Sequence, residues 1–468
     1  MLIQIINFVN IAVLIYFVLL SLGYIFLLIA SIPDIFMRFR ELEHANIISI
    51  MQSRSLPAIT IIIPAYNEEE FVCEMVDSFL NNDYTNIHIM IVNDGSTDKT
   101  LEKLIDTYEL HEAPIMIEPK IKTTDTVKAC YRSKLYKNIT VIDKDHTDRS
   151  DTVNIAVNAC RTPFIMNVDA DTLIERNAIS RIVFYMLTRE NTVAAGGAVY
   201  IINGCTVEDG QIVKTRMPLN PVYAFQTCEY LRSFLFSKSG WNSLGGSLAY
   251  SGAFTAFKHD AIIEVGGYAL NNLAQDFEII LRLRSYRYEH RHEILNRVGY
   301  TPAAMVWTDV PGTLKDYWSQ RFKWQYAILQ SLMAYKRMLF NSKYGIVGLF
   351  TYPFFLFGEA FGAVVETIAY LSLICSLYLG ILNFYTATLF FVLCWGFLIF
   401  LTMTTFFLNY VTFNKYKRTL DVFLILFFSI IEGIGFRQFD VLCRVSATVA
   451  YFFRGLKFWK SDEKKTAV

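Results

Sequence analysis

Charged side chains are scarce in this sequence of 468 residues. Only 18% of the residues are charged, whereas 53% are hydrophobic and 15% are aromatic. An ordinary soluble domain carries about 25% charged residues, so this composition indicates segments that lie in a membrane. Neither positive nor negative charge is in excess, because the formal net charge is zero. The charge therefore gives no indication of a nucleic-acid partner.

The cysteines lack the spacing of a metal site or of a disulfide framework. Eight cysteines are scattered along the chain without a C-x-x-C pair, and the seven histidines form no recognisable ligand set. We therefore expect free thiols in a reducing compartment, and histidines that are structural or on the surface. Internal repeats and low-complexity tracts are also lacking.

Charge is absent from residues 2–32. A helix of this length can cross a hydrocarbon core about 30 Å thick. A secretory signal would have a shorter apolar region and a small-residue cleavage site. We predict a retained transmembrane anchor over residues 1–34. Arg38, Arg40 and Arg54 follow it, which favours a cytoplasmic exit under the positive-inside rule.

A second uncharged stretch covers residues 367–414, with a polar break at residues 383–386. It is long enough for two crossings of about 20 residues each. The preceding residues 348–366 include Pro353, Glu359 and Glu366, and they could lie in the membrane interface.

The number of C-terminal spans is left open, because the apolar run at residues 422–431 is short for a span. We predict interfacial and transmembrane helices over residues 345–458. The basic ending, residues 459–468, is predicted to be a cytoplasmic tail.

Between the apolar regions, residues 55–344 have the pattern of an α/β domain. Four apolar runs are interpreted as strands buried on both faces: Ala58–Pro64, Ile87–Asp94, Ile139–Lys144 and Phe164–Asp169. Helical spacing follows two of them, at residues 69–82 and 98–110. This alternation predicts a mostly parallel sheet that binds ligands at the carboxyl ends of its strands.

Two aspartates, Asp169 and Asp171, follow the last of these runs and precede residues 172–187, which we expect to be helical. The simpler interpretation is a turn in which one aspartate caps that helix. Two carboxylates also suit a divalent cation that binds through carboxylates and substrate phosphates. The first two runs end in acids as well, at residues 61–70 and 91–100. One sheet edge would then hold a nucleoside diphosphate and a metal.

The order of several short motifs resembles that of membrane-bound family 2 glycosyltransferases, the relatives of cellulose, hyaluronan and poly-N-acetylglucosamine synthases. "PAYNEEE" and "VNDGSTD" resemble the nucleotide-binding edges of this family, and "VDADT" resembles its metal motif. "AQDFEIILRLR" resembles the E-D motif that supplies the base, and "QRFKW" resembles the Q-x-x-R-W motif. The resemblance covers nearly the whole chain. It implies a nucleotide-diphospho-sugar transferase domain of GT-A type, fused to transmembrane helices.

The resemblance also implies site residues. Asp276 is the candidate catalytic base, although an aspartate there could equally be a helix N-cap. Asp169 and Asp171 would hold Mg²⁺ or Mn²⁺. The candidate donor-binding residues are Ala65, Tyr66, Glu68, Asp94, Arg149, Asp169, Gln320, Arg321 and Lys323. The candidate acceptor-binding residues are Trp324, Trp307, Glu229 and Tyr230.

Simpler interpretations remain open for two of these groups. The segment around Gln320 and Trp324 could be an amphipathic juxtamembrane helix with a basic face. Glu229 and Tyr230 could belong to a packed amphipathic helix, and this interpretation has about the same weight as the functional one.

The sequence departs from the family pattern in three places. Asp148 and Arg149 stand where relatives carry Gly-Lys, and Gln275 stands where they carry a glutamate before the base. Lys323 replaces an arginine, and lysine lacks the bidentate fork of a guanidinium group. These changes bear on donor identity and turnover more than on reaction type.

The prediction is an inverting, metal-dependent glycosyltransferase in the cell membrane, multi-pass, with a cytoplasmic catalytic domain. It would use a UDP-sugar, with UDP-N-acetylglucosamine and UDP-glucose as leading donors, to build a β-linked exopolysaccharide. One alternative is a transferase that adds a single sugar to a lipid acceptor. Another is a membrane scaffold or transporter subunit with a degenerate domain. The expected partners are the UDP-sugar, a growing glycan or lipid acceptor, membrane lipids and accessory export subunits, and no nucleic acid.

Overall fold

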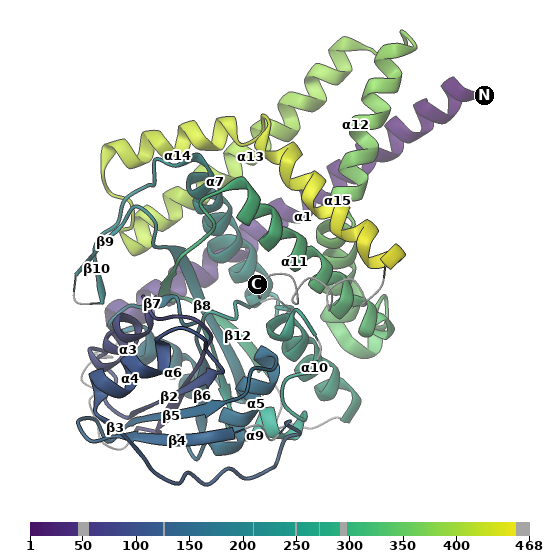
Figure 1. Cartoon of the computed structure of the whole chain (residues 1–468). Helices are drawn as coiled ribbons and strands as arrows, with labels where there is room; N and C mark the ends of the chain where they lie inside the picture. Colours follow the sequence, from purple (N-terminus) through teal and green to yellow (C-terminus); the bar gives the residue numbers. More distant parts are fainter. Residues whose placement is uncertain are drawn as a thin grey trace.

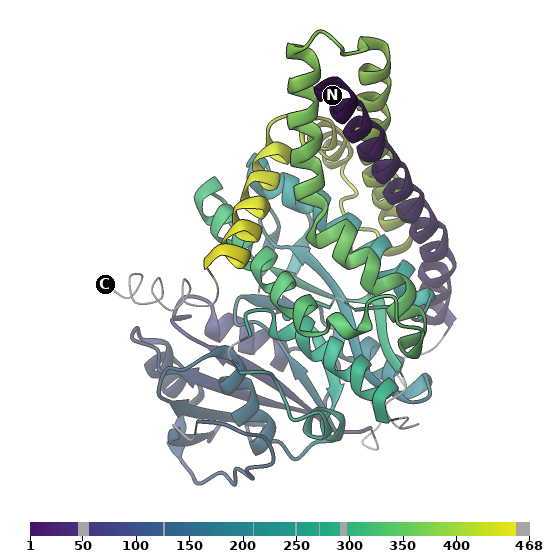
Figure 2. The same ribbon diagram turned by 90° about the vertical axis from the view of Figure 1, so that its right-hand side faces the viewer.

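The computed structural model describes residues 1–44, 56–124, 127–208, 210–248, 250–270, 272–290 and 297–454. A large sheet with its covering helices forms the lower half of the molecule in Figure 1. Long apolar helices project from it, and the N terminus lies at the far end of this projection (Figure 2). The expected tail at residues 459–468 lies outside the described residues.

The four strands that the sequence predicts lie side by side in the centre of the sheet. They are β1 (Ile59–Ala65), β2 (Ile87–Asp94), β5 (Ile139–Lys144) and β6 (Phe164–Asn167), in the spatial order β5-β2-β1-β6. Each neighbouring pair is parallel. This confirms the prediction for these strands, and it brings their carboxyl ends to one edge of the sheet.

The helices between these strands also agree with the sequence pattern. They are α3 (Val72–Leu80), α4 (Thr100–Tyr108) and α5 (Arg149–Ala159). The first two lie inside the predicted ranges 69–82 and 98–110, and they are shorter because turns occupy the ends of those ranges.

The remaining strands make the sheet mixed. The full order is β3-β4-β5-β2-β1-β6-β11-β8-β12-β7. Its further strands are β3 (Leu110–Glu112), β4 (Val127–Ser133), β7 (Thr172–Ile174), β8 (Thr192–Ile201), β11 (Thr255–Lys258) and β12 (Arg297–Thr308). The short β11 is antiparallel to both of its neighbours, β6 and β8. A mostly parallel arrangement therefore describes the four central strands and not the sheet as a whole.

The segment after the two aspartates differs from the sequence prediction. Residues 172–187 were expected to be helical, but β7 (Thr172–Ile174) comes first and α6 (Ala178–Thr188) follows. β7 pairs with the distant strand β12, a partner that local sequence pattern does not reveal. Asp171 therefore precedes a strand and does not cap a helix, which removes the simpler interpretation of this residue.

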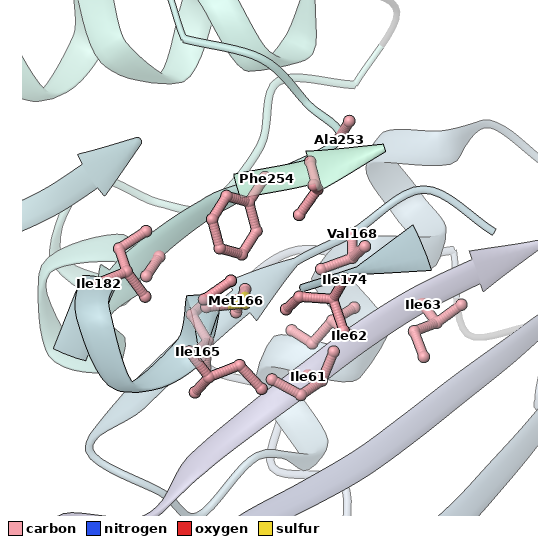
Figure 3. Packing of buried hydrophobic residues seen from close by; sticks show 14 of the residues in the cluster. Ile61, Ile62, Ile63, Ile165, Met166, Val168, Ile174, Ile182, Ala253 and Phe254 are labelled. Atoms are coloured by element: carbon pink, nitrogen blue, oxygen red, sulfur yellow. The ribbon is translucent and has the colours of Figure 1, made fainter. Parts of the chain in front are cut away.

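The core lies between the sheet and its helices, and its tightest part surrounds the middle of β1 (Figure 3). Ile61, Ile62 and Ile63 are completely buried, and Met166 of β6 and Phe254 pack beside them. Burial of successive residues on both faces is typical of central strands covered by helices. The strand ends are held firmly by this packing, and so are the side chains that follow them.

The N-terminal helix α1 (Leu2–His44) is a candidate membrane span that also packs against the sheet domain. Its residues Leu2–Arg40 are long and apolar enough to cross a membrane. Near its C-terminal end, Asp34 pairs with Arg38 at 3.3 Å and accepts a hydrogen bond from Asn242 at 3.0 Å. Arg38 also lies over the ring of Tyr185, 4.8 Å from its centroid. Arg38, one of the three arginines expected to mark a cytoplasmic exit, is thus buried against the folded domain.

Two helices occupy the second uncharged stretch, as predicted. They are α12 (Gly362–Tyr378) and α13 (Phe384–Phe413), and they stand beside the N-terminal part of α1 in both views (Figures 1 and 2). By length and composition, two described helices could cross a membrane, or four if each of two bent helix pairs forms one span.

Two of the candidate spans are pairs of helices joined by a bend. One joins the π-helical turns η4 (Val347–Thr351) and η5 (Phe354–Ala360) to α12 with a bend of 46°. The other joins α14 (Thr419–Ile431) to α15 (Phe436–Arg454) with a bend of 59°. The expected interfacial segment 348–366 falls in the first pair.

Both glutamates of that segment have partners. Glu359 accepts a hydrogen bond from Tyr24 of α1 at 2.7 Å. Glu366 is paired with Arg437 of α15 at 2.7 Å. Pairing lowers the cost of placing carboxylates among apolar helices, and it ties the C-terminal helices to one another and to α1.

A single glycine controls how closely α1 approaches the domain. Gly240 lies in α8 (Lys238–Ser243), where an added Cβ would sit 2.5 Å from the carbonyl oxygen of Leu27. We expect Gly240→Ala to lower the melting temperature of the full-length protein in detergent by several degrees. Overpacking of this kind costs about 1–3 kcal/mol. Differential scanning fluorimetry measures the effect.

Gly396→Ala is the matched control, because Gly396 lies in α13 with nothing within 4 Å of its added Cβ. Equal melting temperatures for the two variants would contradict the proposed close contact between α1 and α8.

Candidate active site

The loops after β1 and β2 are joined by hydrogen bonds into one rim. Asn67 adopts a left-handed backbone conformation with φ of 57°. Its Oδ1 accepts a hydrogen bond from the backbone N–H of Thr97 at 2.8 Å, and its own N–H donates to Oγ of Ser96 at 3.0 Å. The N–H of Glu69 donates to Asp98 Oδ2 at 3.1 Å. The two acidic motifs therefore form a single rigid edge, as the sequence predicted.

Asp94, at the end of β2, is held by a buried lysine. Nζ of Lys144, at the end of β5, lies 2.5 Å from Oδ1 of Asp94, and the N–H of Thr147 donates to the same oxygen at 3.1 Å. Lys144 also lies 3.6 Å from the buried Asp151. The sequence analysis did not single out Lys144, although its place directly after an apolar run is the same signal that marks Asp94.

An aromatic pair stands at the same rim. The rings of Tyr66 and His146 are stacked, with centroids 4.2 Å apart. His146 Nδ1 lies 3.0 Å from Oδ2 of Asp94, and its side chain is 54% exposed. The sequence-based expectation grouped His146 with histidines that are structural or on the surface, and did not place it at the rim. Its position in the sequence between Lys144 and Arg149, which both lie at the site, could have indicated this. Ala65, directly before Tyr66, is buried and supplies only backbone to the rim.

The two aspartates of the metal motif have different surroundings. Asp169 forms an ion pair with Arg149, the first residue of α5. Asp171 accepts hydrogen bonds from the hydroxyl groups of Thr172 at 3.2 Å and Thr308 at 3.3 Å. Burial raises the pKa of Asp171. Arg149 neutralises one of the two carboxylates, and the other is held by neutral donors.

Glu68, which follows β1, contributes a further carboxylate at this edge of the sheet. Its pKa is raised to about 7, first by burial and then by the negative charges of Asp171 and Asp98. The carboxylates of Glu68 and Asp171 therefore face one region of space and interact unfavourably. A cation placed between the rim and Asp171 would relieve this repulsion.

The residues present fit a divalent cation bound partly by its substrate. In the part of the chain that the structure describes, no three His, Cys, Asp or Glu side chains converge on one metal position. Mg²⁺ commonly binds through one or two carboxylates and completes its coordination with water and phosphate oxygens. Asp169 and Asp171 supply such an all-oxygen pair, and the excess of negative charge beside them suits the cation.

Asp276 lies across from this pair, in the first turn of α10 (Gln275–His290). It is inside the helix and so is not an N-cap. Burial raises its pKa, and the positive charge of Arg149 opposes this effect. The carboxylate lies directly over Gly252, so closely that an added Cβ there would overlap it. Arg149 is thus paired with Asp169 and also acts on Asp276, which links the metal motif to the candidate base.

Two departures from the family pattern have clear structural consequences. Asp148 is the N-cap of α5, and its Oδ1 accepts a hydrogen bond from the N–H of Asp151 at 2.8 Å. Gln275 is buried, and its Oε1 accepts from the hydroxyl of Ser150 at 2.8 Å. The amide connects α10 to α5 without a second negative charge beside Asp276. Both replacements therefore support the local structure around Arg149 and Asp276.

Several buried polar atoms around the site have no hydrogen-bond partner among the described residues. They include Nε of Arg149, Oδ1 of Asn167 and Oε1 of Gln320. Asn167 ends β6, and Gln320 lies on α11 (Leu314–Ala334). A buried polar group without a partner is costly, so these atoms mark a region built to contact a polar ligand.

Arg321 does not occupy the position expected for a diphosphate ligand. Its guanidinium group forms a bidentate pair with Glu229, with both N–O distances at 2.7 Å. It lies between the rings of Tyr317 and Trp324, 4.8 and 4.5 Å from their centroids. Arg321 therefore holds α11 against α7 (Pro221–Tyr230). Its guanidinium group has little hydrogen-bonding capacity left for a nucleotide-sugar donor. Lys323 is exposed on the same helix.

Three of the four candidate acceptor residues gather where α7 meets α11. Glu229 is bound to Arg321, and Trp324, which Arg321 also contacts, is 41% exposed. Burial chiefly raises the pKa of Tyr230, and the charges of Arg321 and Asp171 also act on it. Tyr230 thus lies within electrostatic reach of both the metal motif and the α7–α11 contact.

Trp307, the fourth candidate, differs from expectation. Its ring is fully buried in β12, packs against Tyr200 with centroids 5.0 Å apart, and donates its Nε1–H to Glu175 at 3.0 Å. A sugar platform needs an accessible face, which this ring lacks. The physical reason is that β12 is buried along almost its whole length, so a tryptophan at its end completes the core.

Residues 57–327, more than half of the chain, match the family model described as Glycosyltransferase like family 2. The chain belongs to this glycosyltransferase family. The match covers the sheet, the rim, the two aspartates and Asp276, and it ends within α11. The protein is therefore a glycosyltransferase of GT-A type with a large mixed sheet and helices that could span a membrane.

Curated relatives carry one common description. The chain is 26% identical over 272 residues to a poly-beta-1,6-N-acetyl-D-glucosamine synthase of Staphylococcus aureus strain COL, covering 58% of this chain and 54% of that protein. It is 24% identical over 300 residues to the synthase of the same description from Staphylococcus epidermidis strain ATCC 35984, covering 64% and 61%. The chain thus matches little more than half the length of these relatives.

Solved structures show more distant likenesses. One is a mannosyltransferase from Pyrobaculum calidifontis in complex with GDP-mannose and Mn²⁺, with 14% identity, 91% of this chain and 99% of that chain covered, and a TM-score of 0.49. Another is residues 1–349 of TarS from Staphylococcus aureus in complex with UDP, with 14% identity, 84% and 91% covered, and a TM-score of 0.38.

The contact between Gly252 and Asp276 gives a sharp test of the site. We expect Gly252→Ala to lower kcat at least tenfold, because the added Cβ would displace the carboxylate from its place beside Arg149. Nucleotide binding should change little, since Gly252 does not belong to the rim. Transfer assays and nucleotide titration measure the two effects. An unchanged kcat would show that the position of Asp276 does not matter.

Proposed function

We propose that this glycosyltransferase uses a divalent cation and a UDP-sugar to build a β-linked polysaccharide, with inversion at the anomeric carbon. The observation that carries the proposal is the position of Arg149, which pairs with Asp169 and acts on Asp276. The guanidinium group of Arg149 therefore acts both on the candidate metal motif and on the candidate base. Transfer from a nucleotide donor to a hydroxyl group requires that the leaving group and the base lie close together.

Asp276 would act as the general base. Its carboxylate accepts the proton of the acceptor hydroxyl, and the acceptor oxygen forms a bond to the anomeric carbon of the donor sugar. The bond from that carbon to the diphosphate oxygen breaks on the opposite face. A raised pKa suits this role, because a stronger base removes the proton more readily. One base without a second carboxylate placed as nucleophile supports inversion.

The departing diphosphate would meet positive charge and unpaired polar atoms. Arg149 offers Nε, which has no partner in the described structure, and Gln320 offers a second polar contact. Hydrogen bonds from an arginine to phosphate are among the stronger ones in proteins. When bound to Asp169 and Asp171, the cation would neutralise charge on the diphosphate. Arg321 takes no part in this proposal, because it is already paired with Glu229. Lys323, which is exposed on the same helix, is a further candidate to bind the diphosphate.

The rim would bind the nucleoside. Tyr66 presents an aromatic ring 41% exposed, with His146 stacked on it, and a nucleobase can stack on such a surface. Asp94, positioned by Lys144, would face the edge of the base. The description shared by the curated relatives favours UDP-N-acetylglucosamine as the donor, with UDP-glucose as the second candidate.

The growing chain would leave along the contact between α7 and α11 towards the membrane helices. Tyr230 is within electrostatic reach of Asp171 and Arg321. Trp324 of α11 contacts Arg321 and has an exposed face. We propose a multi-pass protein in the cell membrane with its catalytic domain on the cytoplasmic side and with lipids around α1, α12 and α13. Accessory export subunits are further candidate partners.

A donor panel tests the proposal. Membrane vesicles that contain the full-length protein receive labelled UDP-N-acetylglucosamine, UDP-glucose, UDP-galactose or UDP-glucuronate, with Mn²⁺, Mg²⁺ or a chelator. We expect metal-dependent polymer from UDP-N-acetylglucosamine. Asp171→Ala should require at least tenfold more metal for half-maximal rate, because one of the two carboxylate ligands is lost.

The products distinguish the alternatives. Label confined to a lipid extract would replace the polymer with transfer of a single sugar to a lipid acceptor. Equal transfer with chelator and with metal would remove the cation from the proposal. No label from any donor, with no nucleotide-sugar hydrolysis, would favour a membrane scaffold or transporter subunit.

The pH dependence tests Asp276 directly. Because a base must be ionised, kcat/KM should rise with pH through the pKa of Asp276 and level off above it. Burial raises this pKa, with Arg149 and Tyr268 as the charged and titratable neighbours, so the acid limb should lie above the ordinary range of aspartate. Asp276→Asn should reduce transfer by about 10²–10⁴-fold while donor binding remains.

Glu68 needs a separate control, because its pKa of about 7 could produce a limb of its own. The pKa of Asp171 is raised as well, so the profile of Glu68→Gln is recorded at saturating metal, where the cation keeps Asp171 ionised, and the acid limb that persists belongs to Asp276. If Asp276→Asn kept most of the wild-type turnover, another group would have to be the base.

Product length tests Trp324. We expect Trp324→Ala to shorten the polymer or to abolish it, because a glycan loses the aromatic face that holds it after each transfer. Trp324→Phe should retain most of the length, since it keeps a ring at the same place. Gel sizing of labelled product measures the effect, and full-length polymer from Trp324→Ala would return the residue to a structural role.

A further inference from the structure

A second polar cavity lies far from the site described above. It has a volume of about 470 Å³ and opens beside the amino ends of β8 and β12. Its wall includes Glu190, Asn242, Arg284, Arg287 and Arg297. Asp171 lies at the opposite end of β12, where it contacts Thr308. The parallel strand β8, which pairs with β12 from one end to the other, has 10 residues, so the two ends lie about 30 Å apart at about 3.3 Å per residue.

Positive charge gathers in this cavity. Arg284 is buried, and its guanidinium group donates to the carbonyl oxygens of Ser247 and Val298, each at 3.2 Å. These are neutral acceptors, so the charge itself is not balanced by them. Burial chiefly lowers the pKa of Arg284, and the positive charge of the neighbouring Arg287 acts in the same direction. The two side chains therefore repel each other at the cavity wall.

Little negative charge offsets these arginines. Within the described residues, neither Arg287 nor Arg297 forms an ion pair, and Glu190 is the only acid on the cavity wall. Arg297 interacts at longer range with Asp34. That carboxylate is already bound by Arg38 and by Asn242. Three clustered arginines with one acid beside them are stabilised by an anion.

The cavity also adjoins the membrane anchor. Asn242 stands on its wall and donates a hydrogen bond to Asp34 of α1 at 3.0 Å. Asp34 lies close to the end of the candidate span Leu2–Arg40, the part of a membrane helix that meets lipid headgroups. A phosphate at this level can come from a lipid or from solution.

We propose that this cavity binds a phosphate group, carried by a phospholipid headgroup or by a free phosphate ligand, through Arg284, Arg287 and Arg297. Guanidinium groups bind phosphate by paired, charge-assisted hydrogen bonds. Such a ligand would join α10 and β12 next to the point where Asn242 holds α1. The site is separate from the donor site and needs none of its residues.

The test uses full-length protein in neutral detergent and the double variant Arg287→Gln/Arg297→Gln. Arg284 is left unchanged because it is buried. Inorganic phosphate is titrated by calorimetry against chloride of equal ionic strength. Retained lipid is measured by native mass spectrometry after exposure to phosphatidylglycerol, with phosphatidylcholine as the zwitterionic comparison. Arg132→Gln is the matched control, since Arg132 is an exposed arginine on β4, away from the cavity.

We expect the double variant to lose at least tenfold in affinity for the anion, while Arg132→Gln binds as the wild type does. Glu190→Gln should bind more tightly, because it removes the one acid on the wall. Retention of phosphatidylglycerol that the double variant loses identifies a headgroup as the source. Phosphate binding without lipid retention identifies a free ligand. Equal binding of phosphate and lipid by the wild type and the double variant, or no binding by either protein, would overturn the proposal.

Discussion

The ion pair between Arg149 and Asp169 is the interaction on which the active site depends. Parallel strands bring Glu68, Asp94, Asp169 and Asp171 to one edge of the sheet, and carboxylates so close together repel one another. Lys144 balances Asp94 and Arg149 balances Asp169. Asp171 and Glu68 form no ion pair among the described residues, and the pKa of each is raised by burial. The fold therefore leaves negative charge at this edge of the sheet, which a cation bound together with the substrate would balance.

The sequence predicted the part of this arrangement that local pattern determines. Apolar runs identified the four central strands, and acids after them identified the rim, because both features are written in consecutive residues. It did not predict β7, because the strand of three residues exists only by pairing with β12. The partners of Arg321 and Trp307 were not predicted, for a related reason. Glu229 and Glu175 are distant from them in sequence, and each occupies a polar group of the side chain that was expected to contact a ligand.

The departures from the family pattern show how neighbouring positions compensate for one another. A glycine before the cation is replaced by Asp148, which caps α5, and a glutamate before the base is replaced by Gln275, which binds Ser150. In both cases the local structure is kept, and the charge near Asp276 is set mainly by Arg149. Sequence alone showed Gln275 as a loss, because its hydrogen bond with Ser150 crosses between α10 and α5.

The close approach of α1 to α8 has a consequence for how the molecule is assembled. Leu27, Leu28 and Ile35 of α1 are buried against Leu235, Phe236 and Trp241 of the catalytic region. The helix α1 therefore contributes to the hydrophobic core of the catalytic region beside it. Folding of that region and docking of its first helix are then one coupled process. A catalytic region without α1 would carry an uncovered apolar face, and so would tend to aggregate in water.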